Sequence, residues 1–254
     1  MAELPVLWHL KVSHYNEKAR WALDLKRVPH VRRALMAGRQ QAAAKKLTGG
    51  TTTPILVLDG RAIGDSTDII AALEERHPEP ALYPADPAER ERALALEDHF
   101  DEELGPHARR LAMHHMLPDA KLFLGAFASD LDGAQLVAAR AAFPALRRGI
   151  VKQFSIDDEH VALAFDKVRA AGERRAAEAG PDGYLVGDTF TVADLTLAAL
   201  LSPLATPDQF PYPQPQRDDP RFEPVREALR EAGLLEWVRD VYARHRPPSA
   251  EAEA

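Results

Sequence analysis

The sequence predicts two domains of different classes, an α/β domain over residues 1–80 and an all-helical domain over residues 91–246. Over the first domain, short apolar runs typical of strands alternate with helical periodicity. A Pro-rich stretch, HPEPALYPADPAER, then punctuates the chain, and 81–90 is predicted to be a linker. Beyond it only helical periodicity is found, and the polar residues 247–254 are predicted to form a frayed, flexible tail. A chain of 254 residues is long enough for two such cores.

The first domain is predicted to follow the order βαβαββα. Tyr15, Ala19 and Ala22 fall on one helical face, and the dipeptide Asp59-Gly60 is typical of a tight hairpin turn. The predicted elements are, in chain order, a strand at 5–10, a helix at 15–23, a strand at 31–36, a short helix at 39–47, hairpin strands at 54–58 and 61–63, and a helix capped by Ser66.

The second domain is predicted to begin with a long helical stripe that Gly105-Pro106 kinks or breaks. Four further segments have helical periodicity and lie at 133–153, 157–179, 192–204 and 223–245. The proline cluster within 206–220 predicts a loop.

Composition excludes several classes of function. The chain has no cysteine, so it has no disulfide, no thiolate metal site and no protein thiol as nucleophile. Its net charge of −7 argues against a nucleic-acid binder. The charge is uneven, because residues 1–80 carry 12 basic and 9 acidic side chains and residues 81–254 carry 20 and 30. An anionic ligand is therefore expected on the first domain.

The sequence has no pattern of a membrane or exported protein. The first residues have no basic segment followed by a long apolar one, and no apolar run approaches the roughly 18 residues of a membrane span. We expect a cytoplasmic protein without membrane contact.

Ser13 lies where the first predicted strand gives way to a helix. The unpaired N–H groups and the dipole of a helix N-terminus favour an anion such as a thiolate. A hydroxyl there can donate a hydrogen bond to the thiolate and lower its pKa from about 8.5. The alternative is that Ser13 serves only as the helix N-cap.

Two more junctions of the first domain offer polar backbone or side chains. Pro54 opens a strand, and a cis bond would turn the backbone of Thr53 outward, although trans is the commoner isomer. Asp65 and Ser66 precede the next helix, where Ser66 suits a carboxylate and Asp65 an ammonium, although most serine caps serve only their own helix. Together the three junctions could hold an extended peptide that carries carboxylates, an amine and a thiol.

Several segments, in their order and spacing, resemble those of one known family. Four of them are SHYNEKARWALDL, TTTPILVLDG, GDSTDIIAALEERHPEP and LYPADPAERERA, and they resemble the thioredoxin-like N-terminal domain of the glutathione S-transferase superfamily. The segment YLVGDTFTVADLTLAALL resembles the capping motif of its all-helical C-terminal domain, in which Thr191 and Asp194 form a capping box and Phe190 packs on Leu195. The resemblance spans most of the chain and implies the glutathione S-transferase fold, a thioredoxin-like α/β domain followed by an all-α domain.

The resemblance implies a thiol-activating residue in the run Ser-His-Tyr-Asn. Ser13 occupies the place of the activating serine of serine-type transferases, and Asn16 is a second candidate for the contact with the thiol. Because the chain has no cysteine, the thiol-disulfide chemistry of cysteine-type classes is not expected.

The resemblance also implies a glutathione-binding set. Thr53 would pair through its backbone with the cysteinyl part of glutathione, next to a cis bond to Pro54. Asp65 and Ser66 would hold the γ-glutamyl amine and carboxylate, although Asp65 is one methylene shorter than the usual Glu.

In the resembling family, the first helix of the second domain lines the acceptor pocket. His107, Leu111 and His114 are therefore predicted to contact the acceptor, with plain packing or solvation as the alternative. The two histidines lie two helical turns apart, about 10 Å, which is too far for shared metal ligation, so no metal is expected.

These observations predict a glutathione transferase in which Ser13 stabilises the glutathione thiolate for attack on a small hydrophobic electrophile. Fold does not fix function, so two alternatives stay open: a non-catalytic protein that binds glutathione or a hydrophobic ligand, and a glutathione-dependent isomerase or dehalogenase. The resemblance also implies a homodimer.

Overall fold

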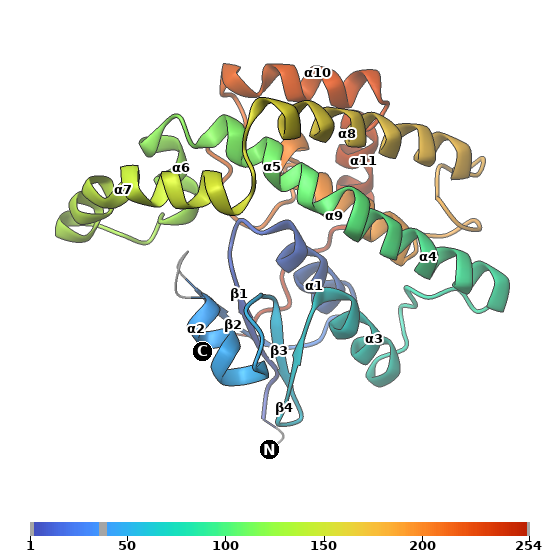
Figure 1. The fold of residues 1–254 in the computed structure, drawn as a ribbon. Helices are drawn as coiled ribbons and strands as arrows, with labels where there is room; N and C mark the ends of the chain where they lie inside the picture. Colours follow the sequence, from blue (N-terminus) through green and yellow to red (C-terminus); the bar gives the residue numbers. More distant parts are fainter. Residues whose placement is uncertain (1–2, 36–39, 253–254) are drawn as a thin grey trace.

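The computed structural model describes residues 3–35 and 40–252. The α/β domain forms the lower part of Figure 1 and the helical domain the upper part. The predicted ends at Met36 and Arg39, and the last two residues of the predicted tail, lie outside the described residues. In the described ranges, no helix has both the length and the apolar character needed to cross a membrane.

The α/β domain has the predicted order of elements. It consists of β1 (Val6–His9), α1 (His14–Leu25), β2 (Val31–Ala34), α2 (Gln40–Thr48), β3 (Ile55–Leu58), β4 (Arg61–Gly64) and α3 (Ser66–Arg76). The strands form one sheet in the order β2-β1-β3-β4, with β1 parallel to β2 and antiparallel to β3. Asp59 and Gly60, with φ of 49° and 77°, close the β3-β4 hairpin as predicted.

The helical domain contains more helices than the sequence predicted. Its α-helices are α4 (Pro87–Glu103), α5 (Gly105–Met116), α6 (Ala120–Phe127), α7 (Gly133–Gln153), α8 (Asp158–Glu178), α9 (Val192–Ala205), α10 (Glu223–Glu231) and α11 (Leu235–His245), with a short 3₁₀ helix, η1 (Pro220–Phe222). The predicted break after Leu104 is present. Helix α4 begins inside the expected linker, because Asp86 caps it and Pro87 suits its first turn.

Two predictions for this domain are corrected by the structure. The expected helix over 223–245 is two helices, because Gly233, with φ of 67°, turns the chain between α10 and α11. Helix α6 was not predicted at all, although Asp119 caps it by accepting hydrogen bonds from Lys121 N and Leu122 N.

The two domains share one continuous apolar core. Helix α1 packs on α3 within its own domain and on α9 of the other, and nearly every residue of α9 is buried. The Trp21 ring of α1 lies against Phe190 and Tyr242, and its indole N–H donates to the His245 carbonyl at 2.9 Å. The helical domain therefore fixes the position of α1, whose N-terminus carries Ser13.

The capping box at the start of α9 is present as predicted. Thr191 N donates to Asp194 Oδ2 at 3.0 Å, and Leu185 N donates to Asp194 Oδ1 at 2.9 Å. The cap closes the N-terminus of the central helix of the shared core.

The prediction of a frayed C-terminal tail is wrong as far as Ala252. Ala250 N donates to Asp24 Oδ1 at 2.8 Å, and Ala252 N donates to the His30 carbonyl at 2.8 Å. Glu251 forms a parallel bridge with His30. The polar composition misled the prediction, because the tail finds its hydrogen-bond partners on the α/β domain rather than in water.

Candidate active site

A cavity of about 720 Å³ lies between the two domains. One wall comes from the loops of the α/β domain, and the opposite wall comes from helices of the helical domain. The α/β wall consists of Leu10, Val12, Ser13, His14, Tyr15, Gln40, Gln41, Thr51, Thr52, Thr53, Pro54, Asp65, Ser66 and Thr67. This size is ordinary for a small-molecule site.

Ser13 is both the N-cap of α1 and a wall residue of the cavity. Its Oγ accepts a hydrogen bond from Asn16 Nδ2 at 2.7 Å and a longer one from Asn16 N at 3.4 Å. A hydroxyl has two acceptor lone pairs and one proton, so Asn16 uses the acceptor side and leaves the proton to be donated. Ser13 is thus the N-cap of α1 and also faces the cavity, so its role as the cap leaves it accessible to a ligand.

Asn16 lies behind Ser13 and not on the cavity wall. Its side chain is fully buried, and Nδ2 also donates to the Thr53 carbonyl at 3.1 Å. Oδ1 accepts from Leu10 N at 3.0 Å. This corrects the expectation that Asn16 could contact the thiol directly, because its amide is used up in joining the Ser13 turn to the Thr53 loop.

The Thr53-Pro54 peptide bond is cis, and both residues lie on the wall beside Ser13. The resemblance implied this isomer, whereas base frequencies favoured trans. The Asn16 amide that holds Ser13 also fixes the Thr53 carbonyl, so these two wall segments have one common support.

Asp65, not Ser66, is the N-cap of α3, which corrects the prediction. Asp65 Oδ1 accepts from Thr67 N at 2.9 Å, and Ser66 is the first helical residue, a largely buried part of the wall. The backbone of Asp65 has φ of 72° and ψ of 140°, a conformation that residues other than glycine rarely adopt. Such strain is typical of sites where a residue is held for a purpose other than stability.

A buried ion network lies under the same end of the cavity. Lys18 Nζ contacts Asp101 Oδ2 at 2.5 Å and Glu97 Oε1 at 3.1 Å, and Thr67 Oγ1, with one proton to donate, lies within hydrogen-bond distance of both carboxylates. Burial is the main cause that raises the pKa of Asp101, and Lys18 opposes it. Asp101 reaches the wall with 14% of its side chain exposed, so this end of the cavity is acidic and suits an ammonium group.

The opposite wall is mostly apolar. Helices α5, α6 and α7 provide most of it, and the loop after α9 closes it with Phe210. The apolar lining residues here are Ala112, Met113, Met116, Phe123, Ala126, Phe127, Leu146 and Ile150 of these helices, and Phe154 just after α7. A cavity with one polar and one apolar end can hold a polar peptide beside a hydrophobic molecule.

The structure does not bring the three predicted acceptor residues to this cavity. Leu111 is fully buried in the main core, and the His107 ring takes part in a hydrogen bond with Arg110 Nη1 at 2.9 Å. The rings of His114 and His115 pack edge to face. Helix α5 is the right helix, but it is rotated so that Arg109 and the residues one turn later face the cavity.

Arg109 is the cationic residue on the apolar wall that sequence reasoning missed. Its guanidinium lies over the Phe154 ring, 4.5 Å from the centroid, and its buried Nε has no hydrogen-bond partner. Burial lowers the pKa of Arg109, but a guanidinium remains charged in proteins. Across the described residues no carboxylate pairs with it.

The residues of α6 that line the cavity were also missed, although the sequence had a signal for this helix. The signal is the Asp119 cap followed by the apolar run LFLGAF.

Within the described ranges, no group of three His, Cys, Asp or Glu side chains could hold a metal ion.

Comparisons with known proteins agree with this arrangement. Residues 7–81 match the family described as glutathione S-transferase, N-terminal domain. A probable maleylacetoacetate isomerase from Caenorhabditis elegans is 34% identical over 94 residues, which are 36% of this chain and 44% of that protein. A maleylpyruvate isomerase from Ralstonia sp is 37% identical over 92 residues, 35% of this chain and 42% of that protein. The matches span less than half the length of these curated relatives.

A solved glutathione S-transferase from Methylobacillus flagellatus KT, with glutathione bound, has the same fold over almost the whole chain. The TM-score is 0.56 at 16% identity, with 96% of this chain and 100% of that chain covered. The N-terminal domain of the chain thus matches the glutathione S-transferase N-terminal domain family, and the whole chain has the glutathione S-transferase fold.

Proposed function

We propose that the protein is a glutathione transferase of serine type. The observation that carries the proposal is the hydrogen-bond arrangement at Ser13: Asn16 occupies the acceptor side of the hydroxyl, so its proton is available to an anion in the cavity. The bound anion is the glutathione thiolate. It lies at the N-terminus of α1, where the helix dipole also favours negative charge.

The remaining polar wall has groups for the rest of glutathione. The backbone of Thr53 pairs with the cysteinyl part, Ser66 and the N-terminus of α3 receive the γ-glutamyl carboxylate, and Asp65 with Asp101 receives its amine. Support comes from the position of these residues around one end of the cavity and from the acidic character of that end.

The chemistry consists of deprotonation and positioning. The glutathione thiol loses its proton to solvent, and the Ser13 hydroxyl and the α1 dipole stabilise the thiolate that remains. The thiolate then forms a carbon–sulfur bond with an electrophilic carbon of a molecule held on the apolar wall, and the displaced electron pair leaves with the departing group.

A second candidate is a glutathione-dependent isomerase, and the unpaired Arg109 favours it. The thiolate would add to a double bond conjugated with a carbonyl, the carbon–carbon bond would rotate, and elimination would return glutathione unchanged. Arg109 would hold a carboxylate of the substrate. The names of the two curated relatives, both isomerases of maleyl acids, support this candidate.

The test is an absorbance titration of the thiolate in the glutathione complex. We expect the wild type to bring the thiol pKa well below about 8.5, and Ser13→Ala to raise it by about 1–2 units, since a hydrogen bond to a charged group contributes roughly 1.5–3 kcal/mol. Turnover with a model electrophile at neutral pH should fall roughly in proportion to the lost thiolate.

Ser129→Ala is the matched control, because Ser129 is exposed and is not on the wall of this cavity. An unchanged thiol pKa in Ser13→Ala would rule out the assigned role of Ser13. Binding of glutathione without any lowering of its thiol pKa would instead identify a passive binding protein.

A further inference from the structure

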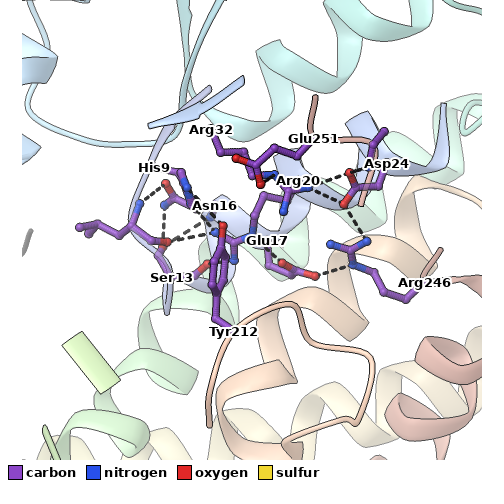
Figure 2. Close-up of polar contacts among 12 residues, drawn as sticks. His9, Ser13, Asn16, Glu17, Arg20, Asp24, Arg32, Tyr212, Arg246 and Glu251 are labelled. Atoms are coloured by element: carbon purple, nitrogen blue, oxygen red, sulfur yellow. Dashed lines mark hydrogen bonds and ion pairs between the residues drawn. The ribbon is translucent and has the colours of Figure 1, made fainter. Parts of the chain in front are cut away.

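A chain of buried charges connects the C-terminal segment with the turn that carries Ser13 (Figure 2). Arg246, just after α11, donates from Nε to Glu17 Oε1 at 2.7 Å. The other oxygen of Glu17, Oε2, accepts from Arg20 Nε, also at 2.7 Å. All three side chains are buried, with at most 1% exposed.

The far end of Arg20 holds the Ser13 turn. Its Nη1 donates to the Leu10 carbonyl at 3.0 Å, and its Nη2 donates to the Ser13 carbonyl at 3.3 Å. His9 Nδ1 accepts a further hydrogen bond from Nη1 at 2.9 Å, and burial, with Arg20 next in weight, lowers the pKa of His9 to about 2. The guanidinium therefore spans the turn from Leu10 to Ser13 and fixes its shape.

A second branch of the same network does not reach Ser13. Asp24 accepts from Arg32 Nη2 at 2.6 Å and from Ala250 N at 2.8 Å, and it pairs with Arg246 Nη1 at 2.8 Å. This branch attaches the tail to the α/β domain. Arg246 is the residue common to both branches, whereas Arg32 belongs to the second alone.

Loss of the Arg246 charge would act on both branches. Glu17 Oε1 would be left buried without a cation, which is costly, so Glu17 would move toward water or toward Arg20. Either movement shifts Arg20 from the carbonyls of Leu10 and Ser13. Loss of Arg32 leaves the contacts of Glu17 and Arg20 in place.

We propose that Arg246 is a positioning residue for the Ser13 hydroxyl, acting through Glu17 and Arg20. The segment 246–252 is then part of the thiol-activating machinery as well as a clasp between the domains. The proposal rests on the proposed function for its effect on the thiol, but its structural consequence at the Ser13 turn is independent of any ligand.

The experiment compares Arg246→Met with Arg32→Met, two variants that each remove one buried arginine from the same network. The first measurement is amide hydrogen exchange of residues 10–16 in the protein without glutathione. We expect exchange there to become roughly tenfold faster in Arg246→Met and to stay near wild type in Arg32→Met, because only the first loosens the turn.

The second measurement is the pKa of the bound glutathione thiol. We expect Arg246→Met to raise it by about half a unit, which is roughly threefold less thiolate at a pH well below it, and Arg32→Met to leave it unchanged. Arg246→Lys, which keeps a cation beside Glu17, should return most of the shift. If Arg246→Met does not fold, Arg246→Gln replaces it, since it keeps a donor for Glu17 without the charge.

Equal exchange of residues 10–16 in the two methionine variants would overturn the proposal and reduce the network to a clasp between domains. If the wild type does not lower the thiol pKa, the proposed function fails, while the exchange measurement still decides whether Arg246 holds the turn. If the wild type lowers the thiol pKa and Arg246→Met lowers it by the same amount, the positioning role alone is overturned.

Discussion

At the scale of single residues, the wall next to Ser13 could be predicted and the wall opposite could not. Ser13, Thr53, Pro54, Asp65 and Ser66 all line the cavity, because each lies at a junction of the α/β unit where local chain geometry exposes it. The predicted residues of α5 do not line it. A rotation of α5 about its axis exchanges one face for another, and packing against α8 and α9 sets that rotation.

At this scale, we predict that Arg109 favours acceptors that bear a carboxylate. Arg109→Leu should raise the KM for an acceptor that bears a carboxylate by about ten- to a hundredfold, since a charge-assisted hydrogen bond contributes roughly 1.5–3 kcal/mol. The KM for a neutral acceptor should change little, because an apolar side chain still covers Phe154. Steady-state kinetics with the paired acceptors measures both.

Arg109→Lys is the companion variant, and it should retain part of the preference for the anionic acceptor because the charge stays. Equal losses with anionic and neutral acceptors would show that Arg109 only packs against the wall and does not select the acceptor.

At the scale of elements, local sequence signals predicted most of the helices but not the close contacts between them. Gly172, inside α8, is an example: a Cβ there would lie 2.4 Å from the carbonyl oxygen of Ala232, just after α10. Gly149, inside α7, has no atom within 4 Å of such a Cβ. In the sequence both are glycines within segments of helical periodicity, and nothing local distinguishes them. They differ because α8 crosses the end of α10 at Gly172, whereas no other element of the described residues lies against Gly149.

This pair gives a prediction for stability. Gly149→Ala should raise the free energy of unfolding by up to about 1 kcal/mol, because alanine is the better helix former. Gly172→Ala has the same intrinsic gain but should lower the free energy of unfolding by about 1–3 kcal/mol, because the backbone at Ala232 must move. Urea unfolding followed by circular dichroism measures both values, and a stabilised Gly172→Ala would contradict the close contact.

At the scale of the whole molecule, burial keeps several histidines neutral. Burial is the main cause that lowers the pKa of His9 to about 2, of His14 to about 3 and of His115 to about 4. His14 lies between α1 and α5, where its Nε2 donates to the Gly105 carbonyl at 2.9 Å. The unfolded chain takes up these protons near pH 6.5 and the folded chain does not.

The lowered histidine pKa values make the folded state less stable as the pH falls. Each such histidine lowers the free energy of unfolding as the pH falls from about 6.5 toward its folded pKa, by about 1.4 kcal/mol per pH unit. Asp194 acts in the opposite direction between about pH 6 and 4, because burial raises its pKa to about 6. Because these contributions oppose each other in the wild type, the test compares the pH dependence of the free energy of unfolding between variants.

His14→Gln keeps a donor for the Gly105 carbonyl and cannot be protonated. Its stability, measured by urea unfolding at pH 7 and pH 5, should fall less on acidification than that of the wild type, by roughly 1–2 kcal/mol over the interval. His99→Gln, at an exposed histidine, should follow the wild type. Identical pH responses of all three proteins would mean that His14 takes up its proton in the folded state.

The sequence by itself determined the α/β-then-helical order, the capping box of α9 and the wall residues next to Ser13, because these depend on apolar periodicity, caps and turns within a few residues of each other. Only the tertiary structure decided which face of α5 meets the cavity and that Asn16 lies behind Ser13. It also decided that the polar tail docks on the α/β domain through Arg246 and Asp24. Each of these depends on groups far apart in the chain, since a buried charge or amide is tolerated only where a distant partner satisfies it.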